Sequence, residues 1–228
     1  MTRIILPFFL ALFAGALALS LPATANDAQP TKRIALSFDD VPRGEGAYFT
    51  SDERTARLIA GLKEAGVEQA AFFVNPGRIA KRPGAEERIA AYVAAGHVIA
   101  NHTNTHPRLS DTSVEDYLSD LDAAADWLKG REGLRPWFRF PFLDEGRRDP
   151  EKRDAMRAAL AERGLTNAYV TVDASDWFYE HELGLAVRAG MQVNQEAMRD
   201  LYVEVHVEAA EAYDALARQA TGRSPAHV

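Results

Sequence analysis

The sequence predicts an α/β fold in which helices cover a parallel sheet. Short apolar runs alternate along the chain with longer segments of helical period, which is the pattern of βα units. Five such units can be counted after residue 32. The length of 228 residues, with 47% hydrophobic and 26% charged side chains, fits one globular domain.

The first two units each start with an apolar run that predicts a buried strand. Thr50-x-x-Glu53 predicts the start of the first helix, because the two side chains of such a capping box satisfy free backbone N–H groups. Gly66 predicts its end. The expected elements are a strand at 34–38, a helix between Thr50 and Gly66, a strand at 70–74 and a helix at 85–95.

The later units follow the same pattern. Thr112-x-x-Glu115 is a second capping box, and Pro141 closes the fourth strand because proline cannot donate to a ladder. The expected elements are a strand at 97–101, a helix opened at Thr112, a strand at 135–140, a helix at 150–163, a strand at 168–172 and mostly helix from 180 to 220. Residues 224–228 resemble the start of another strand.

The first 25 residues have the pattern of a signal peptide. Arg3 precedes an almost uncharged apolar run, and the small-residue sequence 23–25 (Ala-Thr-Ala) follows it. Residues 26–32 are then expected to be a polar tether and residues 33–228 the folded domain. This predicts an exported protein, periplasmic or extracellular. The alternative is an uncleaved membrane anchor, since the apolar run 4–21 approaches spanning length.

Charge and cysteine content exclude several classes of partner and site. The formal net charge of −7 argues against a nucleic-acid partner and against strong attraction to anionic membranes. Because the chain has no cysteine, disulfides and thiolate ligands are excluded. Any metal site must therefore use histidine and carboxylate side chains.

Polar residues follow two predicted strands at their ends, where parallel α/β folds carry catalytic groups. Asp39 and Asp40 follow the first strand, and such a pair can divide metal binding and proton removal between its members. A turn or helix cap would also use such a pair. His102 and His106 are four residues apart, so on a helical turn they share one face and could share a metal ion. The alternative is a pair of surface or hydrogen-bonded core histidines.

Two further strand ends carry candidate residues. Arg139 ends the fourth strand, where its guanidinium could pair with a carboxylate from the first strand or form an ordinary salt bridge. Asp176 and Trp177 follow the fifth strand. The acid repeats the arrangement at the first strand, and the indole could line a sugar or acetyl pocket, although tryptophan is more often a core residue.

Four short motifs, SFDD, HTNTH, RFPF and DASDW, occur in this order at successive strand ends. Together they resemble the motif series of the polysaccharide deacetylase family, the NodB-homology carbohydrate esterases of family 4. The resemblance extends from about Lys32 to Trp177. It implies a distorted (β/α) barrel that removes acetyl groups, as amides or as esters, from a carbohydrate polymer or oligomer.

The resemblance also implies roles for single residues. Asp40, His102 and His106 would bind a divalent metal ion, expected to be zinc, with cobalt or nickel as alternatives. Asp39 would be the general base. The other matched residues are Arg139, which pairs with the base, Asp176, which orients a late histidine, Phe142, whose backbone N–H would help to hold the oxyanion, and Trp177, which would form a wall of the substrate pocket.

One motif of the family has no match in this chain. A Leu-x-His sequence on a late strand should supply the general acid, and neither His206 nor His227 has that setting. We therefore expect the natural chain to continue beyond Val228, so that the sequence given would be C-terminally truncated. The missing acid also raises a second hypothesis, a carbohydrate-binding homologue with the same barrel and impaired catalysis. A third, an iron oxygenase with the same ligand types, is disfavoured by the βα pattern.

Overall fold

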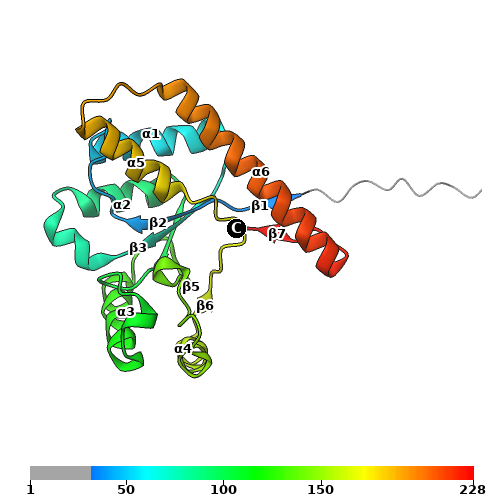
Figure 1. Cartoon of the computed structure of the whole chain (residues 1–228). Coiled ribbons are helices and arrows are strands. Elements are labelled where there is room, and N and C mark those ends of the chain that lie inside the picture. Colours follow the sequence, from blue (N-terminus) through cyan, green and yellow to red (C-terminus); the bar gives the residue numbers. More distant parts are fainter. Residues whose placement is uncertain (1–31) are drawn as a thin grey trace, which may run out of the picture. The chain divides into compact units, whose positions relative to one another are not determined.

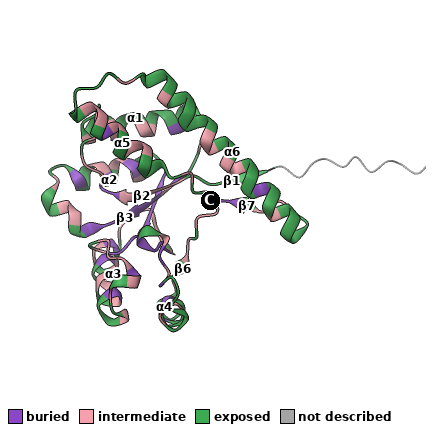
Figure 2. Cartoon of the chain, in the orientation of Figure 1, coloured by how far each residue is buried: buried purple, intermediate pink, exposed green. Residues whose placement is uncertain are grey.

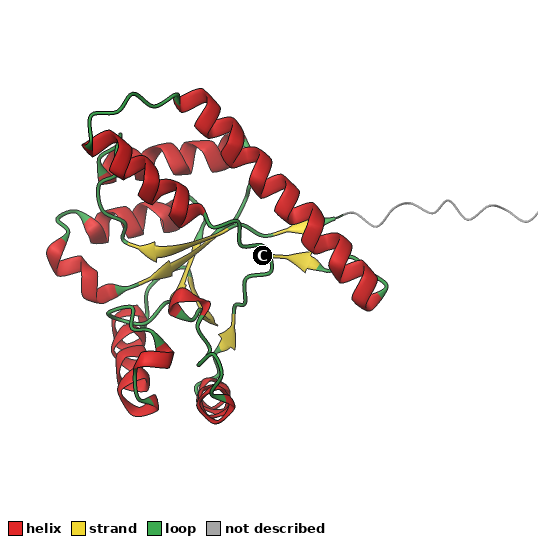
Figure 3. Ribbon diagram, in the orientation of Figure 1, coloured by secondary structure: helices red, strands yellow, loops and turns green. Residues whose placement is uncertain are grey.

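The computed structural model describes residues 32–228, so the predicted signal peptide and nearly all of the predicted tether lie outside the described residues. Five parallel strands form the main sheet, in the order β2-β3-β4-β5-β6 (Figure 3). They are β2 (Ser37–Val41), β3 (Ala71–Val74), β4 (Val98–Asn101), β5 (Leu134–Phe138) and β6 (Thr166–Asn167). The parallel sheet confirms the predicted α/β class.

Helices connect successive strands of this sheet. They are α1 (Ser51–Glu64), α2 (Ala85–Ala94), α3 (Val114–Leu128) and α4 (Pro150–Glu162), with short 3-10 helices η1 (Pro76–Lys81), η2 (Leu109–Asp111) and η3 (Pro141–Leu143). Helix α1 packs against α2, and α3 packs against α4 and β4. In the view of Figure 1, α1 and α2 lie above the sheet and α3 and α4 lie below it. No helix within residues 32–228 is long and apolar enough to cross a membrane.

A second pair of strands lies beyond the main sheet. Strands β1 (Arg33–Ile34) and β7 (Ala226–His227) pair in parallel, and α5 (Asp176–Arg188) and α6 (Gln195–Thr221) precede β7. The predicted late helices and the predicted strand start near residue 224 are thus both present. Thr171 N and Val172 N donate to Val228 O at 2.8 and 3.0 Å, and Ala35 N donates to His227 O at 2.8 Å. Strands β1 and β7 thus form a short ladder, whereas residues 171 and 172 reach the chain end only through single hydrogen bonds to Val228 O.

Three predicted boundaries are wrong. The first strand is broken after Ile34 and resumes at Ser37, so Asp39 and Asp40 lie within β2 rather than behind a strand. Helix α3 is capped by Ser113, whose hydroxyl accepts from Asp116 N at 3.0 Å, whereas the hydroxyl of Thr112 donates to a backbone carbonyl. The fifth strand is only the two-residue β6, and the apolar run 168–172 has no ladder partner.

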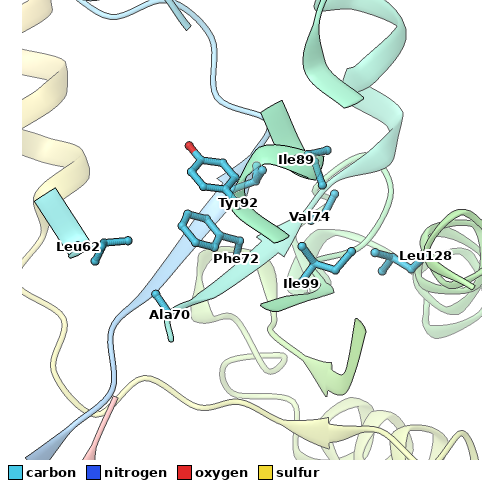
Figure 4. Packing of buried hydrophobic residues seen from close by; sticks show 9 residues of the cluster. Leu62, Ala70, Phe72, Val74, Ile89, Tyr92, Ile99 and Leu128 are labelled. Carbon is cyan, nitrogen blue, oxygen red and sulfur yellow. The ribbon is translucent and has the colours of Figure 1, made fainter. Parts of the chain in front are cut away.

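The core consists of two clusters of buried side chains. The first contains side chains of β2, β3, β4, α1 and α2 together with Leu128 of α3 (Figure 4). Phe72 stacks in it on Tyr92 and on Phe38. The second contains Leu121, Phe138 and other residues of α3, β5 and α4. Figure 2 shows β3 and β4 buried, whereas most of α6 is exposed. Strands β3 and β4 are therefore held more firmly than the late helices.

A buried carboxylate joins α6 to the β1-β7 pair. Asp214 is only 2% exposed and accepts a hydrogen bond from Ser224 Oγ. Lys32 Nζ lies 3.3 Å, Arg218 Nη2 3.1 Å and His227 Nε2 3.4 Å from its oxygens. The hydrogen bond from Ser224 is the largest of the effects that lower the pKa of Asp214 to about 2.

This carboxylate is expected to make stability depend on pH in the acidic range. A carboxyl group whose folded pKa is depressed stabilises the fold above its unfolded pKa, here 3.8, and loses that contribution as the pH falls towards about 2. The difference in urea midpoint between the native protein and Asp214→Asn should therefore be constant above about pH 5 and shrink below about pH 4. A difference that stays the same down to pH 2.5 would contradict this assignment.

Candidate active site

Three of the predicted site residues meet at the carboxyl edge of the sheet. One ligand atom from each of Asp40, His102 and His106 lies within 4.8 Å of the other two, and within residues 32–228 no other such group of His, Asp and Glu side chains is found. His106 Nε2 lies 3.2 Å from Asp40 Oδ1, and the two imidazole rings are 4.9 Å apart. Two imidazoles and a carboxylate are ligands that fit a divalent ion such as zinc.

The tautomer of His102 follows from its hydrogen bond. His102 is 1% exposed, and its Nδ1 lies 2.8 Å from the carbonyl oxygen of Arg139. Because a carbonyl oxygen only accepts, Nδ1 must carry the proton and Nε2 keeps a free lone pair. Burial is also the main cause that lowers the pKa of His102 and brings the pKa of His106 to about 4. Both rings are thus neutral at pH 7, as metal ligands must be.

An irregularity in β2 places the side chains of two consecutive aspartates beside the two histidines. Neighbouring residues of a regular strand point to opposite faces of a sheet. Here the register of β2 against β3 shifts between Phe38 and Val41, and Asp40 has a φ of 65°. Asp39 Oδ2 consequently lies 3.9 Å from His102 Nε2, while Asp40 lies beside His106. A bulge of this kind redirects a side chain next to a functional site.

Asp40 also contacts two arginines. Arg78 Nη1 from η1 lies 2.7 Å from Asp40 Oδ1, and Arg43 Nη1 lies 3.3 Å from Asp40 Oδ2. Burial alone raises the pKa of Asp40, but His106 and the two guanidinium groups outweigh it, so the net pKa is below the usual value. Arg43 and Arg54 both pair with Glu180 of α5, which ties this late helix to the rim of the site.

The segment that carries the two histidines is an irregular loop, so the helical turn assumed from their spacing is wrong. Its shape is fixed by polar side chains instead. Asn101 Oδ1 accepts from Thr103 N at 2.8 Å, and Thr103 Oγ1 accepts from His106 N at 3.2 Å. Asn75 Nδ2 donates to the carbonyl oxygens of His102 and Thr103. These bonds bring the rings together without a helix.

Arg139 is paired with Asp39, as the sequence pattern predicts. Its Nη1 donates to Asp39 Oδ1 at 2.8 Å and to Ser37 Oγ at 2.7 Å, and its Nε donates to Ala168 O at 2.8 Å. The guanidinium is 2% exposed and lies over the ring of Phe73 at 4.0 Å. It is thus held rigidly, and it fixes one oxygen of Asp39 while the side chain of Asp39 remains 33% exposed.

The remaining predicted residues lie at different distances from this set. The Phe142 ring is 4.5 Å from the His106 ring and 53% exposed, so it borders the site. Trp177 is 63% exposed, and among the described residues its ring is near Phe178 but near none of the candidate ligands. Asp176 begins α5, its pKa is raised, mainly by burial, and within residues 32–228 it forms no hydrogen bond with Asp39. The roles of these three residues stay predictions.

Backbone strain is concentrated at this site. Seven non-glycine residues of 32–228 have positive φ, and four of them are Asp40, Thr103, His106 and Phe142. Such conformations cost of order 1–3 kcal/mol each and persist where the surroundings fix them. Their clustering around one group of polar side chains is typical of functional sites.

The comparison with protein families agrees with this geometry. Residues 26–168 match the family model described as polysaccharide deacetylase, which covers more than half of the chain. The chain belongs to the polysaccharide deacetylase family. Strands β2 to β6 and all of the candidate residues except Asp176 and Trp177 lie within the matched segment.

Several relatives in this family have names that state an activity. A chitin deacetylase of Cryptococcus neoformans is 29% identical over 160 residues, which cover 65% of this chain and 30% of that protein. A chitooligosaccharide deacetylase of a Bradyrhizobium species is 29% identical over 154 residues, covering 67% of this chain and 62% of that protein. A family 4 carbohydrate esterase from Streptomyces lividans, solved with acetate, is 28% identical, with a TM-score of 0.48 and coverage of 64% and 66%. The match thus spans less than two thirds of the curated relatives' length.

Sequence reasoning missed three polar residues that shape the candidate site. Asn75 ends β3 and would have been found by the criterion that selected Asp39, a polar residue at a strand end. Arg78 lies in a short 3-10 helix that has no sequence pattern of its own. Asp120 lies in α3, where it reads as an ordinary surface acid of an amphipathic helix. It contacts the loop of residues 102–106, called the histidine loop below, and this contact is visible only in three dimensions.

Asp120 is expected to support metal binding through the histidine loop. Its Oδ2 accepts from Asn104 N and Thr105 N at 2.9 Å each, and its Oδ1 accepts from Thr105 Oγ1 at 2.8 Å. Loss of a residue that orients ligands typically lowers metal affinity about 10–100-fold. Asp120→Ala should therefore weaken zinc binding by about that factor in a chelator-competition titration. The control is Asp122→Ala on the same helix as Asp120. It breaks only a surface pair with Arg163 at the end of α4 and should leave the affinity unchanged.

Proposed function

We propose that this chain is a metal-dependent hydrolase that removes acetyl groups from a carbohydrate. The observation that carries the proposal is the convergence of Asp40, His102 and His106 beside Asp39, whose other oxygen is held by Arg139. Family membership and the names of the relatives, deacetylases of chitin and of chitooligosaccharides, support the same reaction class. The substrate would carry its acetyl group as an amide or as an ester.

Asp40, His102 and His106 would hold the metal ion, for which zinc is expected and cobalt or nickel would also fit. When bound, such an ion polarises an acyl carbonyl and makes water more acidic. The neutral state of both imidazoles leaves their lone pairs available. Phe142 would contribute its backbone N–H to the developing oxyanion, because its left-handed conformation (φ 58°, ψ 15°) turns the chain at the rim of the site.

Asp39 would act as the general base. Its Oδ1 accepts from Arg139 and its Oδ2 remains free on the side of His102, so one oxygen is fixed and the other can take a proton from the attacking water. Arg139 would hold this carboxylate in its orientation through the 2.8 Å hydrogen bond to Oδ1. Hydroxide then adds to the carbonyl carbon, and cleavage releases acetate and the sugar amine or alcohol. The proton that Asp39 takes from water would have to reach the leaving nitrogen or oxygen. Asp176 would have the family role of orienting the late histidine that delivers it, a histidine assigned to no residue of this chain, and Trp177 would line the pocket.

The organisation of the chain is part of the same proposal. Residues 1–25 would direct export and residues 33–228 would form the deacetylase domain, which acts on an acetylated glycan outside the cytoplasm. Several relatives are named peptidoglycan deacetylases, and one of them, from Bacillus cereus, is 32% identical over 105 residues. Export would bring this chain to substrates of that kind.

Acetate release is the direct test. Purified protein with added zinc should release acetate from N-acetylated chitooligosaccharides, and EDTA should abolish the release until zinc, cobalt or nickel is restored. Release that continues after the protein has been shown by elemental analysis to contain no metal would overturn the proposal. Binding of the oligosaccharide with no acetate release under any metal would instead favour the carbohydrate-binding alternative.

A further inference from the structure

Helix α5, which lies outside the matched family segment, has few fixed contacts with the rest of the described chain. Gly184 is its only buried residue, and its N-cap residue, Ser175, provides no side-chain cap. Within residues 32–228, every side-chain hydrogen bond and ion pair from α5 to another segment involves Glu180. The position of α5 therefore depends strongly on this one carboxylate.

Glu180 holds two arginines that come from different segments. Arg54 Nη2 of α1 lies 2.7 Å from Glu180 Oε1, and α5 lies beside α1 in the view of Figure 1. Arg43 Nη2 donates to Glu180 Oε2. The other terminal nitrogen of the same guanidinium, Nη1, lies 3.3 Å from Oδ2 of Asp40, a candidate metal ligand. Arg43 is therefore shared between the metal site and α5.

A divalent ion on Asp40 would change how Arg43 is shared. The ion and the guanidinium are both positive and contact the same carboxylate, so they oppose each other there. Metal binding at Asp40 thus moves Arg43 towards Glu180 and holds α5 in place more firmly. Coupling between two equilibria is reciprocal. Loss of the Glu180 charge therefore leaves Arg43 to Asp40 and disfavours metal binding.

The two other arginines beside these carboxylates do not make this connection. Arg78 Nη1 lies 2.7 Å from Asp40 Oδ1, but among the described residues Asp40 is the only acid with which it pairs. Arg54 pairs in the same way with Glu180 alone. Within residues 32–228, only Arg43 contacts both carboxylates.

We propose that Arg43 is a positioning residue that couples metal binding at Asp40 to the docking of α5 through Glu180. Metal binding would then fix the helix whose first turn carries Asp176 and Trp177, the residues expected to orient the late histidine and to line the pocket. That side of the site would be completed only after the ion is bound. This inference rests on the proposed metal site, but neither of its tests needs turnover.

Zinc affinity is the first test, measured by chelator competition at low ionic strength and constant pH. Because these ion pairs are partly exposed and screened, Glu180→Gln should lower the affinity about fivefold, and Arg43→Gln should raise it by a similar factor. Arg43→Gln/Glu180→Gln should match Arg43→Gln alone, since Glu180 acts through Arg43. An affinity that falls in Arg43→Gln, or two effects that simply add in the double variant, would overturn the inference.

Arg54→Gln is the matched control, since it removes a partner of Glu180 without touching a metal ligand. The zinc affinity of this variant should differ from the native value by less than about twofold. A change as large as that in Arg43→Gln would show that the attachment of α5 alone sets the affinity, and it would contradict the role of Arg43.

Amide hydrogen exchange of α5 is the second test. Saturating zinc should slow exchange in α5 about fivefold in the native protein and less than about twofold in Arg43→Gln and in Glu180→Gln. An equal slowing in Arg43→Gln would overturn the inference even if the native protein binds zinc and releases acetate. Absence of acetate release with this coupling intact would overturn the proposed function alone, and a native protein that binds no zinc would overturn both.

Discussion

Asp39→Asn is expected to lower kcat for acetate release by about 10²–10⁴-fold while the protein still binds its metal ion. Asparagine is isosteric with aspartate, and its Oδ1 can still accept the hydrogen bond from Arg139 Nη1 that now measures 2.8 Å. It cannot take a proton from water, so only the base function is removed. Turnover should be measured with saturating zinc, and metal content by elemental analysis of the same samples.

Two controls make this result specific. His102→Ala removes a candidate ligand and should lose both metal and turnover, because one imidazole and one carboxylate bind zinc far less well than three ligands do. Asp52→Asn changes an exposed acid at the start of α1 that pairs with Arg88, and it should leave both unchanged. Turnover of Asp39→Asn within a few-fold of the native value, at full metal content, would remove the base role from this residue.

The site residues that could be predicted from the sequence are those placed together by the order and direction of the strands. Parallel strands in chain order bring their carboxyl ends to one edge, so residues at the ends of β2, β4 and β5 were expected to meet there. Asp39 and Arg139 do meet, as do Asp40 and the two histidines. The bulge that turns Asp40 towards His106 has no sequence signal, because it depends on the register between two strands.

The predictions that failed relied on local patterns that tertiary contacts overrode. Spacing suggested a helical turn for His102 and His106, but side chains from three other segments fix that loop in an irregular shape, Asp120 among them. The apolar run 168–172 suggested a strand, yet only single hydrogen bonds, such as that between Thr171 N and Val228 O, reach it. Strands are defined by their partners, so a run without a continuous partner forms no ladder.

The helix boundaries were predicted most accurately where a side chain closes a local hydrogen bond. The capping box of Thr50 and Glu53 is present in both of its bonds, and Gly66 follows α1 with a φ of 70°. At α3, two adjacent hydroxyl residues could each have been the cap, and the structure uses Ser113. Sequence could not separate them, because both have the side chain that a cap requires.

Truncation of Phe72 is expected to have the largest effect on stability. Phe72 is fully buried in β3, and its ring stacks on Tyr92 at 3.9 Å (Figure 4). It also stacks on Phe38 at 5.1 Å. Phe72→Ala would remove apolar area from both contacts and leave a cavity that the rigid sheet cannot close, at a cost of about 3–5 kcal/mol in the free energy of unfolding. Equilibrium unfolding in urea, followed by circular dichroism, measures this difference.

The same substitution at an exposed phenylalanine is the control. It shows whether the loss of stability comes from the buried position of Phe72 or from the loss of any phenylalanine ring. Phe178 in α5 is 48% exposed, so Phe178→Ala creates no cavity and should change the free energy of unfolding by only about 0.5 kcal/mol. Asn75 directly follows β3 and donates to the carbonyl oxygens of His102 and Thr103, so the loss of Phe72 should weaken zinc binding as well as the fold. An equal and small effect of both substitutions would mean that the cluster around Phe72 does not hold the sheet that positions the site.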